Sequence, residues 1–224
     1  MNVSEKRYKN LGNISIINEI DNSSLRVLDI GCGAGDNARI LMEKGKIVDG
    51  ITLSMAESEV AKNHCRDVFI YNLEKGLPNV VKEREYEVII CSHVLEHICW
   101  PEILLNDIYN LLEKTNGTLL VALPNIMHYK FRSKLILGNF DYTPSGTMDN
   151  THFRWYTFKS ARQLFINNHF IINKSWVDVS LPCKSLSEKL LPKFIHPFFK
   201  NVLAQISPGL FGSQLLYKLR VKEN

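Results

Sequence analysis

The segment Val27–Ala38 constrains the fold of this chain more than any other part of it. An apolar run ends in Asp29, and the glycines Gly31, Gly33 and Gly35 follow at alternate positions before a segment that favours helix. Glycine tolerates positive φ and, having no Cβ atom, lets a ligand approach the backbone closely. The pattern therefore predicts a buried strand, a tight turn and a helix start beside a bound molecule. Its GxGxG spacing differs from the GxGxxG of dinucleotide-binding folds.

Strand-like and helix-like segments alternate along most of the chain. Parallel strands are predicted at about 25–30, 46–51, 67–71, 86–91 and 117–123, and later strands at 170–179 and 212–221. An amphipathic helix over 101–112 begins at Pro101, which suits a first helical turn, and its pattern stops before Gly117. A further helix is predicted near 158–168. This alternation predicts an α/β fold with helices on both faces of the sheet.

The length of 224 residues indicates a single domain over 1–224, with residues 1–24 as an N-terminal helical cap. Two segments interrupt the alternation: 124–157, with two prolines and two glycines, and 181–209, with four prolines. Long insertions in an α/β domain usually act as lids or binding loops, so both are predicted to cover a substrate site. In open α/β sheets such a site lies at the carboxyl ends of the strands.

Composition narrows the function classes. The net charge of +4 argues against a dedicated nucleic-acid binder, although residues 180–224 hold seven Lys or Arg and two Asp or Glu. This basic region, with the segment 193–200, is a candidate for peripheral membrane contact or for a substrate lid. The five cysteines are scattered without a CxxC pair, and no secretion signal or spanning segment is visible, which indicates a cytoplasmic protein. The oligomeric state is not indicated.

The residues 28–35, LDIGCGAG, resemble the cofactor loop of class I S-adenosylmethionine-dependent methyltransferases. VLEH at 94–97 and THFR at 151–154 are similar to motifs of a bacterial subgroup that includes O-methyltransferases of ubiquinone synthesis and of surface-glycan systems. The resemblance implies a Rossmann-like, seven-stranded, mostly parallel sheet with an antiparallel last strand. It also implies S-adenosylmethionine as the cofactor.

The resemblance assigns the cofactor to the ends of the first strands. Gly31, Cys32, Gly33 and Gly35 would lie under its methionine part, and Asp29 or Asp36 would pair with its ammonium group. Members of the family usually carry a ribose-binding acid at the position of Thr52. Here Thr52 offers one hydroxyl beside Leu53, and Glu57 in the next helix is a second candidate for the ribose.

The adenine and the donor methyl would lie near the third and fourth strands. The family often has Asp-Leu where this chain has Asn72 and Leu73, so the Asn72 amide oxygen would accept from the adenine amino group while Leu73 packs on the ring. Alternatively Asn72 only ends the strand in a turn, since Asn favours turns. Ser92 and His93, at the end of the fourth strand, complete the expected cofactor set.

The catalytic end is predicted from His93, Glu96, His97 and His152. Small-RNA 2′-O-methyltransferases resemble this chain here, and they bind a divalent metal through an ExxEH motif and a later His. The same four residues are therefore candidate metal ligands, although His93 stands where that family has Glu. Alternatively His97 or His152 acts as a general base without metal, supported by Glu96, or the set is only structural.

The acceptor is less constrained than the cofactor. A hydroxyl of a sugar, a glycan precursor or another small polar metabolite is favoured. RNA ribose is the alternative, weakened by the modest charge. A second alternative is that the chain is a non-catalytic partner protein with this fold, because it has Thr52 where the family carries a ribose-binding acid. HxxEH at 93–97 also matches an inverted zinc-protease signature, but that reading leaves the glycine loop unexplained.

Overall fold

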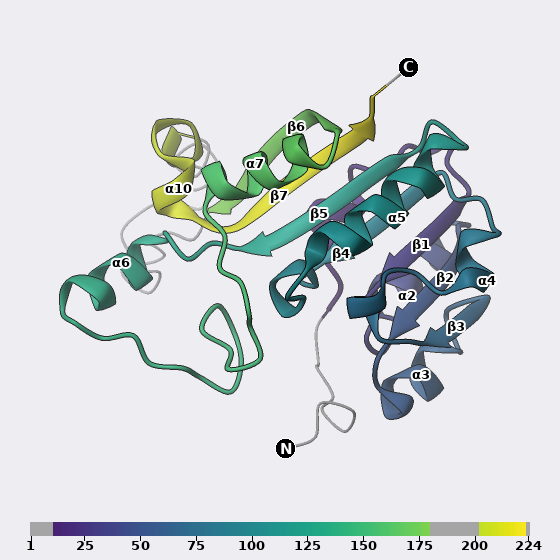
Figure 1. Ribbon diagram of the computed structural model, residues 1–224, viewed down its shortest axis with the longest axis horizontal. Coiled ribbons are helices and arrows are strands. Elements are labelled where there is room, and N and C mark those ends of the chain that lie inside the picture. Colours follow the sequence, from purple (N-terminus) through teal and green to yellow (C-terminus); the bar gives the residue numbers. More distant parts are fainter. Residues whose placement is uncertain (1–10, 180–201, 223–224) are drawn as a thin grey trace.

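A computed structural model describes residues 11–179 and 202–222, and its centre is one seven-stranded sheet (Figure 1). The strand order is β3-β2-β1-β4-β5-β7-β6. β1 to β5 run parallel, and β7 lies antiparallel between β5 and β6. The strands are β1 (Arg26–Ile30), β2 (Ile47–Thr52), β3 (Asp67–Ile70), β4 (Val88–Ser92), β5 (Thr118–Pro124), β6 (Phe170–Val179) and β7 (Gly212–Val221).

Helices separate the strands as the alternation predicted. They are α1 (Ile14–Ile17), α2 (Asp36–Glu43), α3 (Met55–Ala61), α4 (Asn79–Lys82), α5 (Pro101–Glu113), α6 (Tyr129–Ile136), α7 (Phe158–Asn167) and α10 (Pro208–Phe211), with short 3₁₀ turns η2 (Leu73–Lys75) and η3 (Leu95–His97). The predicted α/β fold with an antiparallel last strand is confirmed. Every predicted strand is present with its ends displaced by at most two residues.

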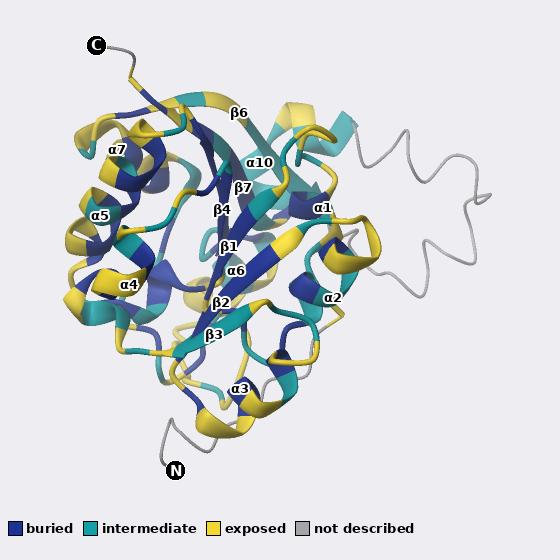
Figure 2. Ribbon diagram, turned by 90° about the vertical axis from the view of Figure 1, so that its right-hand side faces the viewer, coloured by how far each residue is buried: buried dark blue, intermediate teal, exposed yellow. Residues whose placement is uncertain are grey.

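The inner strands of the sheet are mostly buried, and Figure 2 shows them dark between two helical layers, whereas the edge strands β3 and β6 are only partly buried. One core cluster joins the sheet to α4, α5 and α7, and a second joins it to α1 and α2. β5 is buried at all seven positions. Such continuous apolar strands are expected where helices cover both faces of parallel strands.

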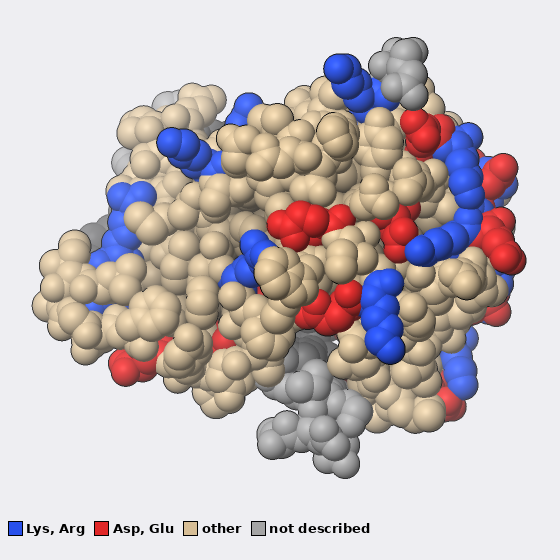
Figure 3. Space-filling model, viewed as in Figure 1, with Lys and Arg blue, Asp and Glu red and all other residues tan. Residues whose placement is uncertain are grey.

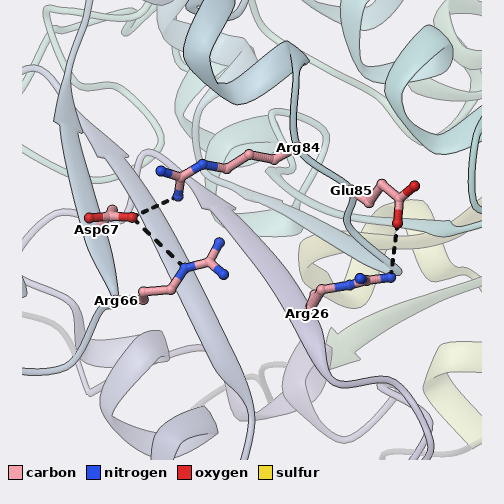
Figure 4. A pocket seen from close by; sticks show the side chains of 5 residues that line it. All are labelled: Arg26, Arg66, Asp67, Arg84 and Glu85. Carbon is pink, nitrogen blue, oxygen red and sulfur yellow. Dashed lines mark hydrogen bonds and ion pairs between the residues drawn. The ribbon is translucent and has the colours of Figure 1, made fainter.

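The amino ends of the strands carry a buried ionic network. Asp49 in β2 is 0% exposed and accepts hydrogen bonds from Arg66, Arg84 and the Tyr86 hydroxyl. Arg66 and Arg84 also approach Asp67 in the open hollow drawn in Figure 4. In this hollow each arginine faces an acid, so the cluster neutralises itself and stabilises the sheet edge that lies opposite the carboxyl ends of β1 to β5.

The first predicted insertion is an excursion from the sheet. After β5 the chain forms α6 and a long loop, which reaches away from the body before it returns to α7 (Figure 1). Residues 180–201, which include most of the second predicted insertion and the basic segment 193–200, lie outside the described residues. Only α1 is helical in the described part of the predicted cap, residues 11–24. None of the helices described has the length and apolar character needed to cross a membrane.

We expect Asp49→Asn to lower the free energy of unfolding by about 3–5 kcal/mol, because it leaves two partly buried guanidinium groups without their shared anion. Chemical denaturation measures this change. Glu59→Gln is the control, because Glu59 pairs with Lys62 on the surface and such pairs contribute about 1 kcal/mol or less. Equal effects of the two substitutions would contradict a structural role for the network.

The same variant tests the pH dependence. Burial alone would raise the pKa of Asp49, but hydrogen bonds from Arg66, Tyr86 and Arg84 lower it below its usual value. The stabilisation is therefore present above the unfolded pKa, about 4, and is lost as the pH falls through the lower folded pKa. The difference in unfolding free energy between wild type and Asp49→Asn should shrink in this acid range.

Candidate functional site

The site lies where β1 and β4 end side by side. These strands pair in parallel, with Ile30 opposite Cys91, so the glycine loop after β1 and the turn after β4 meet at one edge of the sheet. Gly31 packs directly on Val94, since a Cβ atom at Gly31 would overlap the Val94 side chain. β2 runs on one side of β1 and β5 on the other side of β4, so this edge is the topological switch point where open α/β sheets bind ligands.

The glycines of the loop do not all leave room for a ligand. The position of a Cβ atom at Gly35 lies 3.0 Å from the backbone of Ala61, and Gly31 is filled by Val94. At Gly33 the nearest atom is Glu57 Oε1 at 3.8 Å. The Cβ sides of Gly31 and Gly35 thus serve packing of the protein itself, and the contact of all three glycines with a cofactor stays a prediction. Gly33 alone of the three has room for a Cβ atom, at ordinary van der Waals distance from Glu57.

Asp29 presents an unsatisfied carboxylate oxygen beside this loop. Its side chain is 1% exposed, and Oδ1 accepts a hydrogen bond of 3.3 Å from the Asn37 amide. Oδ2 is buried without a hydrogen-bond partner among the described residues. Burial raises the pKa of Asp29 to about 7, against the lowering by Asn37. An oxygen in this state is suited to a cationic hydrogen-bond donor.

Thr52 and Glu57 form a second acidic wall. The Thr52 hydroxyl donates to Glu57 Oε2 at 3.1 Å and accepts from the Ser54 amide. Ser54 caps α3 by accepting from the Glu57 amide, which orients the first turn of that helix. The Glu57 carboxylate thereby lies next to Gly33, with Oε1 3.8 Å from the position of a Cβ atom there. α3 thus brings an acid to the end of β2, although β2 itself ends in Thr52.

Two residues expected to contact the cofactor also make contacts inside the protein. The Cys32 side chain packs against Gly50 of β2, and its amide donates to Ile51, so Cys32 is used inside the protein. The hydrogen bond with Cys65 and burial raise the pKa of the Cys32 thiol well above its usual value, which keeps it neutral. The Asn72 amide oxygen accepts from the Glu74 amide and caps η2, as the turn alternative predicted.

The remaining expected cofactor residues differ in their surroundings. Leu53 is exposed after β2, whereas Leu73 is partly buried and packs on the main core. The Ser92 hydroxyl accepts a hydrogen bond of 3.1 Å from the Asn13 amide group. A link from residue 13 to the end of β4 was not predicted from the sequence.

The structure brings Glu96, His97 and His152 together. The His97 and His152 rings lie edge to face with centroids 4.6 Å apart. A ring nitrogen of each and a Glu96 carboxylate oxygen lie within 4.8 Å of one another. η3 after β4 supplies Glu96 and His97, and the returning lid supplies His152. The expected convergence of these residues is therefore present in the fold.

Hydrogen bonds fix which nitrogens carry protons. His97 Nδ1 lies 3.3 Å from the Thr151 carbonyl oxygen and 3.1 Å from its hydroxyl, whose own proton goes to Asp149. His152 Nδ1 lies 3.1 Å from the Thr147 carbonyl oxygen. A carbonyl only accepts, so both Nδ1 atoms must donate. Each neutral ring therefore keeps its lone pair on Nε2.

Glu96 adds a third lone-pair donor. Its carboxyl is 1% exposed, and Oε2 is buried without a hydrogen-bond partner among the described residues. A ring nitrogen of each histidine and a Glu96 carboxylate oxygen therefore meet in one small space. Burial lowers the pKa of His152, which favours its neutral form. A cation, or a substrate hydroxyl that donates a proton, would satisfy the set.

His93 lies outside this set, contrary to the expectation that it ligates metal. Its Nε2 lies 3.0 Å from Gln214 Oε1, and its Nδ1 lies 3.3 Å from Glu96 Oε1. Gln214 donates its amide to Asp178, so its oxygen faces His93 and both His93 nitrogens point at acceptors. Burial lowers the pKa of His93, but Glu96 outweighs it and raises that pKa. Both His93 nitrogens are therefore engaged within the protein, and His93 holds Glu96 in place.

The lid is fastened to η3 at its returning end. The amides of Phe153 and Arg154 both donate to the Glu96 carbonyl, and Arg154 Nε donates to the Cys99 carbonyl at 2.8 Å. Tyr156 is buried and bridges to Asn125 after β5. Arg154 therefore positions His152 over His97. Thr151, Asp149 and Gln214, which orient the histidines, were missed because neither spacing nor residue type marks such supporting contacts.

The chain is similar in sequence to known methyltransferases. A family model described as a methyltransferase domain matches residues 4–171. The chain is 28% identical over 192 residues to the ubiquinone biosynthesis O-methyltransferase of Coxiella burnetii, covering 76% of each chain. It is 31% identical over 139 residues to the protein of that name from Histophilus somni, covering 57% of this chain and 58% of that one.

Solved structures share the fold at low identity. A SAM-dependent methyltransferase from Archaeoglobus fulgidus superposes with a TM-score of 0.61 at 16% identity, covering 89% of this chain and 87% of that one. The O-methyltransferase of a trans-AT PKS multienzyme of Brevibacillus brevis, in complex with S-adenosyl-L-homocysteine, gives 0.55 at 21% identity, covering 92% and 69%.

The packing of the glycine loop yields a prediction. Gly31→Ala and Gly33→Ala both place a Cβ atom at positive φ, which costs about 1–2 kcal/mol each. Gly31→Ala also overlaps Val94 and should lose about 1–3 kcal/mol more in the free energy of unfolding. Chemical denaturation of Gly31→Ala, of Val94→Ala and of the variant that carries both substitutions measures the coupling free energy between Gly31 and Val94. If the effects of Gly31→Ala and Val94→Ala simply add, the loops after β1 and β4 do not depend on each other.

Proposed function

Because the chain belongs to the methyltransferase domain family, and is a SAM-dependent methyltransferase, we propose that it transfers the methyl group to a hydroxyl oxygen. We further propose that Glu96, His97 and His152 hold a divalent metal ion at that acceptor. The observation that carries the proposal is the convergence of two imidazoles and one carboxylate at the end of β4, with Nδ1 of each imidazole directed at a backbone carbonyl. They follow the strand that pairs with β1, whose glycine loop would hold the cofactor.

The residues after β1 and β2 fit S-adenosylmethionine. Asp29 Oδ2 would accept from its ammonium group, which satisfies a buried oxygen that otherwise has no partner. The backbone of the glycine loop would lie against the methionine part. The Glu57 carboxylate, held by Thr52, would bind the ribose hydroxyls in place of the acid that the family carries at the end of this strand. When bound, the cofactor supplies a methyl group on a positively charged sulfur.

Glu96, His97 and His152, which we call the triad, have the ligand types that a borderline divalent ion prefers. Two imidazoles and one carboxylate are common ligands for Zn²⁺, Mn²⁺ or Fe²⁺, and each histidine donates its other N–H to a backbone carbonyl, the supporting contact typical of metal sites. Such an ion lowers the pKa of a bound hydroxyl. Three protein ligands leave coordination positions for two acceptor oxygens, which would orient one of them toward the methyl group.

The acceptor class follows from this pairing of oxygens. We favour a sugar, a glycan precursor or another polar metabolite with two neighbouring oxygens. The relatives from Coxiella burnetii and Histophilus somni are named for ubiquinone biosynthesis, which makes a quinone precursor the second candidate. RNA ribose also offers neighbouring oxygens, but the net charge of +4 provides little attraction for a phosphate backbone.

A screen with radiolabelled S-adenosylmethionine tests the reaction. Acceptors with adjacent oxygens, including sugar precursors, catechols and short RNAs, should be methylated faster than analogues in which one of the two oxygens is removed. A chain that binds the cofactor but methylates none of these classes would support the partner-protein alternative instead. Transfer to an acceptor nitrogen would overturn O-methylation.

Cofactor affinity should depend on Asp29. Because burial raises the pKa of Asp29 to about 7, only the ionised fraction pairs well with the ammonium group. Affinity for S-adenosylhomocysteine, measured by calorimetry, should rise roughly tenfold from about pH 6 to about pH 8. Asp29→Asn should bind weakly with a much flatter pH dependence, whereas Asp36→Asn should keep the wild-type dependence. Identical profiles for wild type and Asp29→Asn would exclude this contact.

Metal binding is testable without turnover. Co²⁺ titration followed by visible absorption should show one site, and His152→Asn, His97→Asn or Glu96→Gln should weaken it at least about tenfold. His169→Asn is the matched control, since His169 is exposed at the end of α7. Chelation should also lower methyl transfer. Unchanged affinity in all three site variants would place the ion elsewhere, and unchanged activity after chelation would favour a metal-free base.

A further inference from the structure

The lid contains a helix with an unusual environment. None of the eight residues of α6 is buried. Every residue from Ser133 to Tyr142 is exposed, through the second half of α6 and the loop after it. We call residues 129–142 the lid lobe. A helix this short gains little stability from its own hydrogen bonds, and helices of globular proteins usually bury one face.

The lid lobe exposes a continuous apolar tip. Ile136 is 84% exposed and Leu137 is 76% exposed, and Leu135, Phe140 and Tyr142 are also exposed. Isolated apolar side chains are common on protein surfaces, but three in a row at the end of a helix beside two aromatic rings form a patch. Such a patch gains free energy when it leaves water.

The same lobe is positively charged on its helix. Lys130, Arg132 and Lys134 lie within α6, and the lid lobe contains one acid, Asp141, in the loop after the helix. None of these cations forms an ion pair with an acid in the described ranges. In Figure 3 the left-hand end of the molecule, where Figure 1 places α6, is mostly uncharged surface with blue patches over it and a red patch below them.

We propose that the lid lobe docks on the surface of an anionic lipid bilayer. Apolar tip residues that enter the acyl boundary, flanked by cations at the level of the headgroups, are the pattern by which peripheral segments bind membranes. A second copy of the chain fits less well, because a two-fold contact would place the cations of two lobes against each other. The apolar tip also offers nothing to a nucleic-acid backbone.

The lid lobe is connected to the candidate site. The chain that leaves it reaches Thr147, Asp149 and Thr151, the residues that orient His97 and His152. Docking would thus place a bilayer at one end of the lid and the triad at the other. The inference concerns binding to the bilayer alone and does not depend on which acceptor is methylated.

Vesicle flotation with the full chain tests the proposal. Vesicles of phosphatidylcholine mixed with phosphatidylglycerol should bind the protein, and vesicles of phosphatidylcholine alone should bind it much less. Ile136→Ser with Leu137→Ser should reduce partitioning at least about tenfold. Ile166→Ser with Ile171→Ser is the matched control, because these two side chains are about half exposed away from the lid lobe, and it should bind like wild type.

The cations require their own variant. Lys130→Gln with Lys134→Gln should reduce binding to the anionic vesicles about tenfold or more at low salt, and high salt should reduce wild-type binding similarly. Equal binding to both vesicle types, no binding to either, or full binding of the tip variant would overturn the proposal. A concentration-dependent dimer in sedimentation velocity that the tip variant abolishes would assign the patch to a second copy instead.

These outcomes are separable from the proposed chemistry. Vesicle binding is measured without cofactor or acceptor, and S-adenosylhomocysteine affinity should be the same in the tip variant as in wild type. Loss of cofactor affinity in that variant would indicate misfolding, and a circular dichroism melt would identify it. In that case Ile136→Ser alone serves as the milder test.

Discussion

The structure has to stabilise two buried carboxylates, at the carboxyl ends of β1 and β4. Asp29 and Glu96 are each 1% exposed, and each has one oxygen without a hydrogen-bond partner among the described residues. An unsatisfied buried charge costs several kcal/mol. The apolar burial of the inner strands between two helical layers offsets this unfavourable free energy. The two oxygens then become places where a cationic ligand group adds stability.

The two carboxylates have different surroundings, which suit them to different ligand groups. Asp29 has one amide donor, Asn37, and burial raises its pKa, so it remains responsive to a ligand. Glu96 is held by His93 on one oxygen, and its carboxylate lies within 4.8 Å of a ring nitrogen of His97 and of His152. The contact between Gly31 and Val94 ties the two loops together. A displacement of the glycine loop after β1 would therefore displace Val94 and, next to it, Glu96 and His97.

The fold was predictable from the sequence because its determinants are local. The apolar strands and amphipathic helices predicted all seven strands, and the resemblance supplied the antiparallel last one. The convergence of His97 with His152 was anticipated from motifs that lie 55 positions apart. The environment of each atom was not: Cys32, Asn72 and His93 make internal contacts that depend on Gly50, Glu74 and Gln214. Gly50 and Gln214 come from other strands, so residue spacing carries no signal for them, whereas Glu74 lies two residues after Asn72 and fits the turn that the sequence offered as an alternative.

The most direct test is a crystal of the protein grown with S-adenosylhomocysteine and Mn²⁺, measured at a wavelength where manganese scatters anomalously. The account predicts one anomalous peak at bonding distance, about 2.0–2.3 Å, from Glu96 Oε2 and from Nε2 of His97 and His152, with the ligand's ammonium group on Asp29. It also predicts that His93 does not touch the ion. A peak elsewhere, or a triad whose lone pairs are filled by protein hydrogen bonds in the complex, would contradict it.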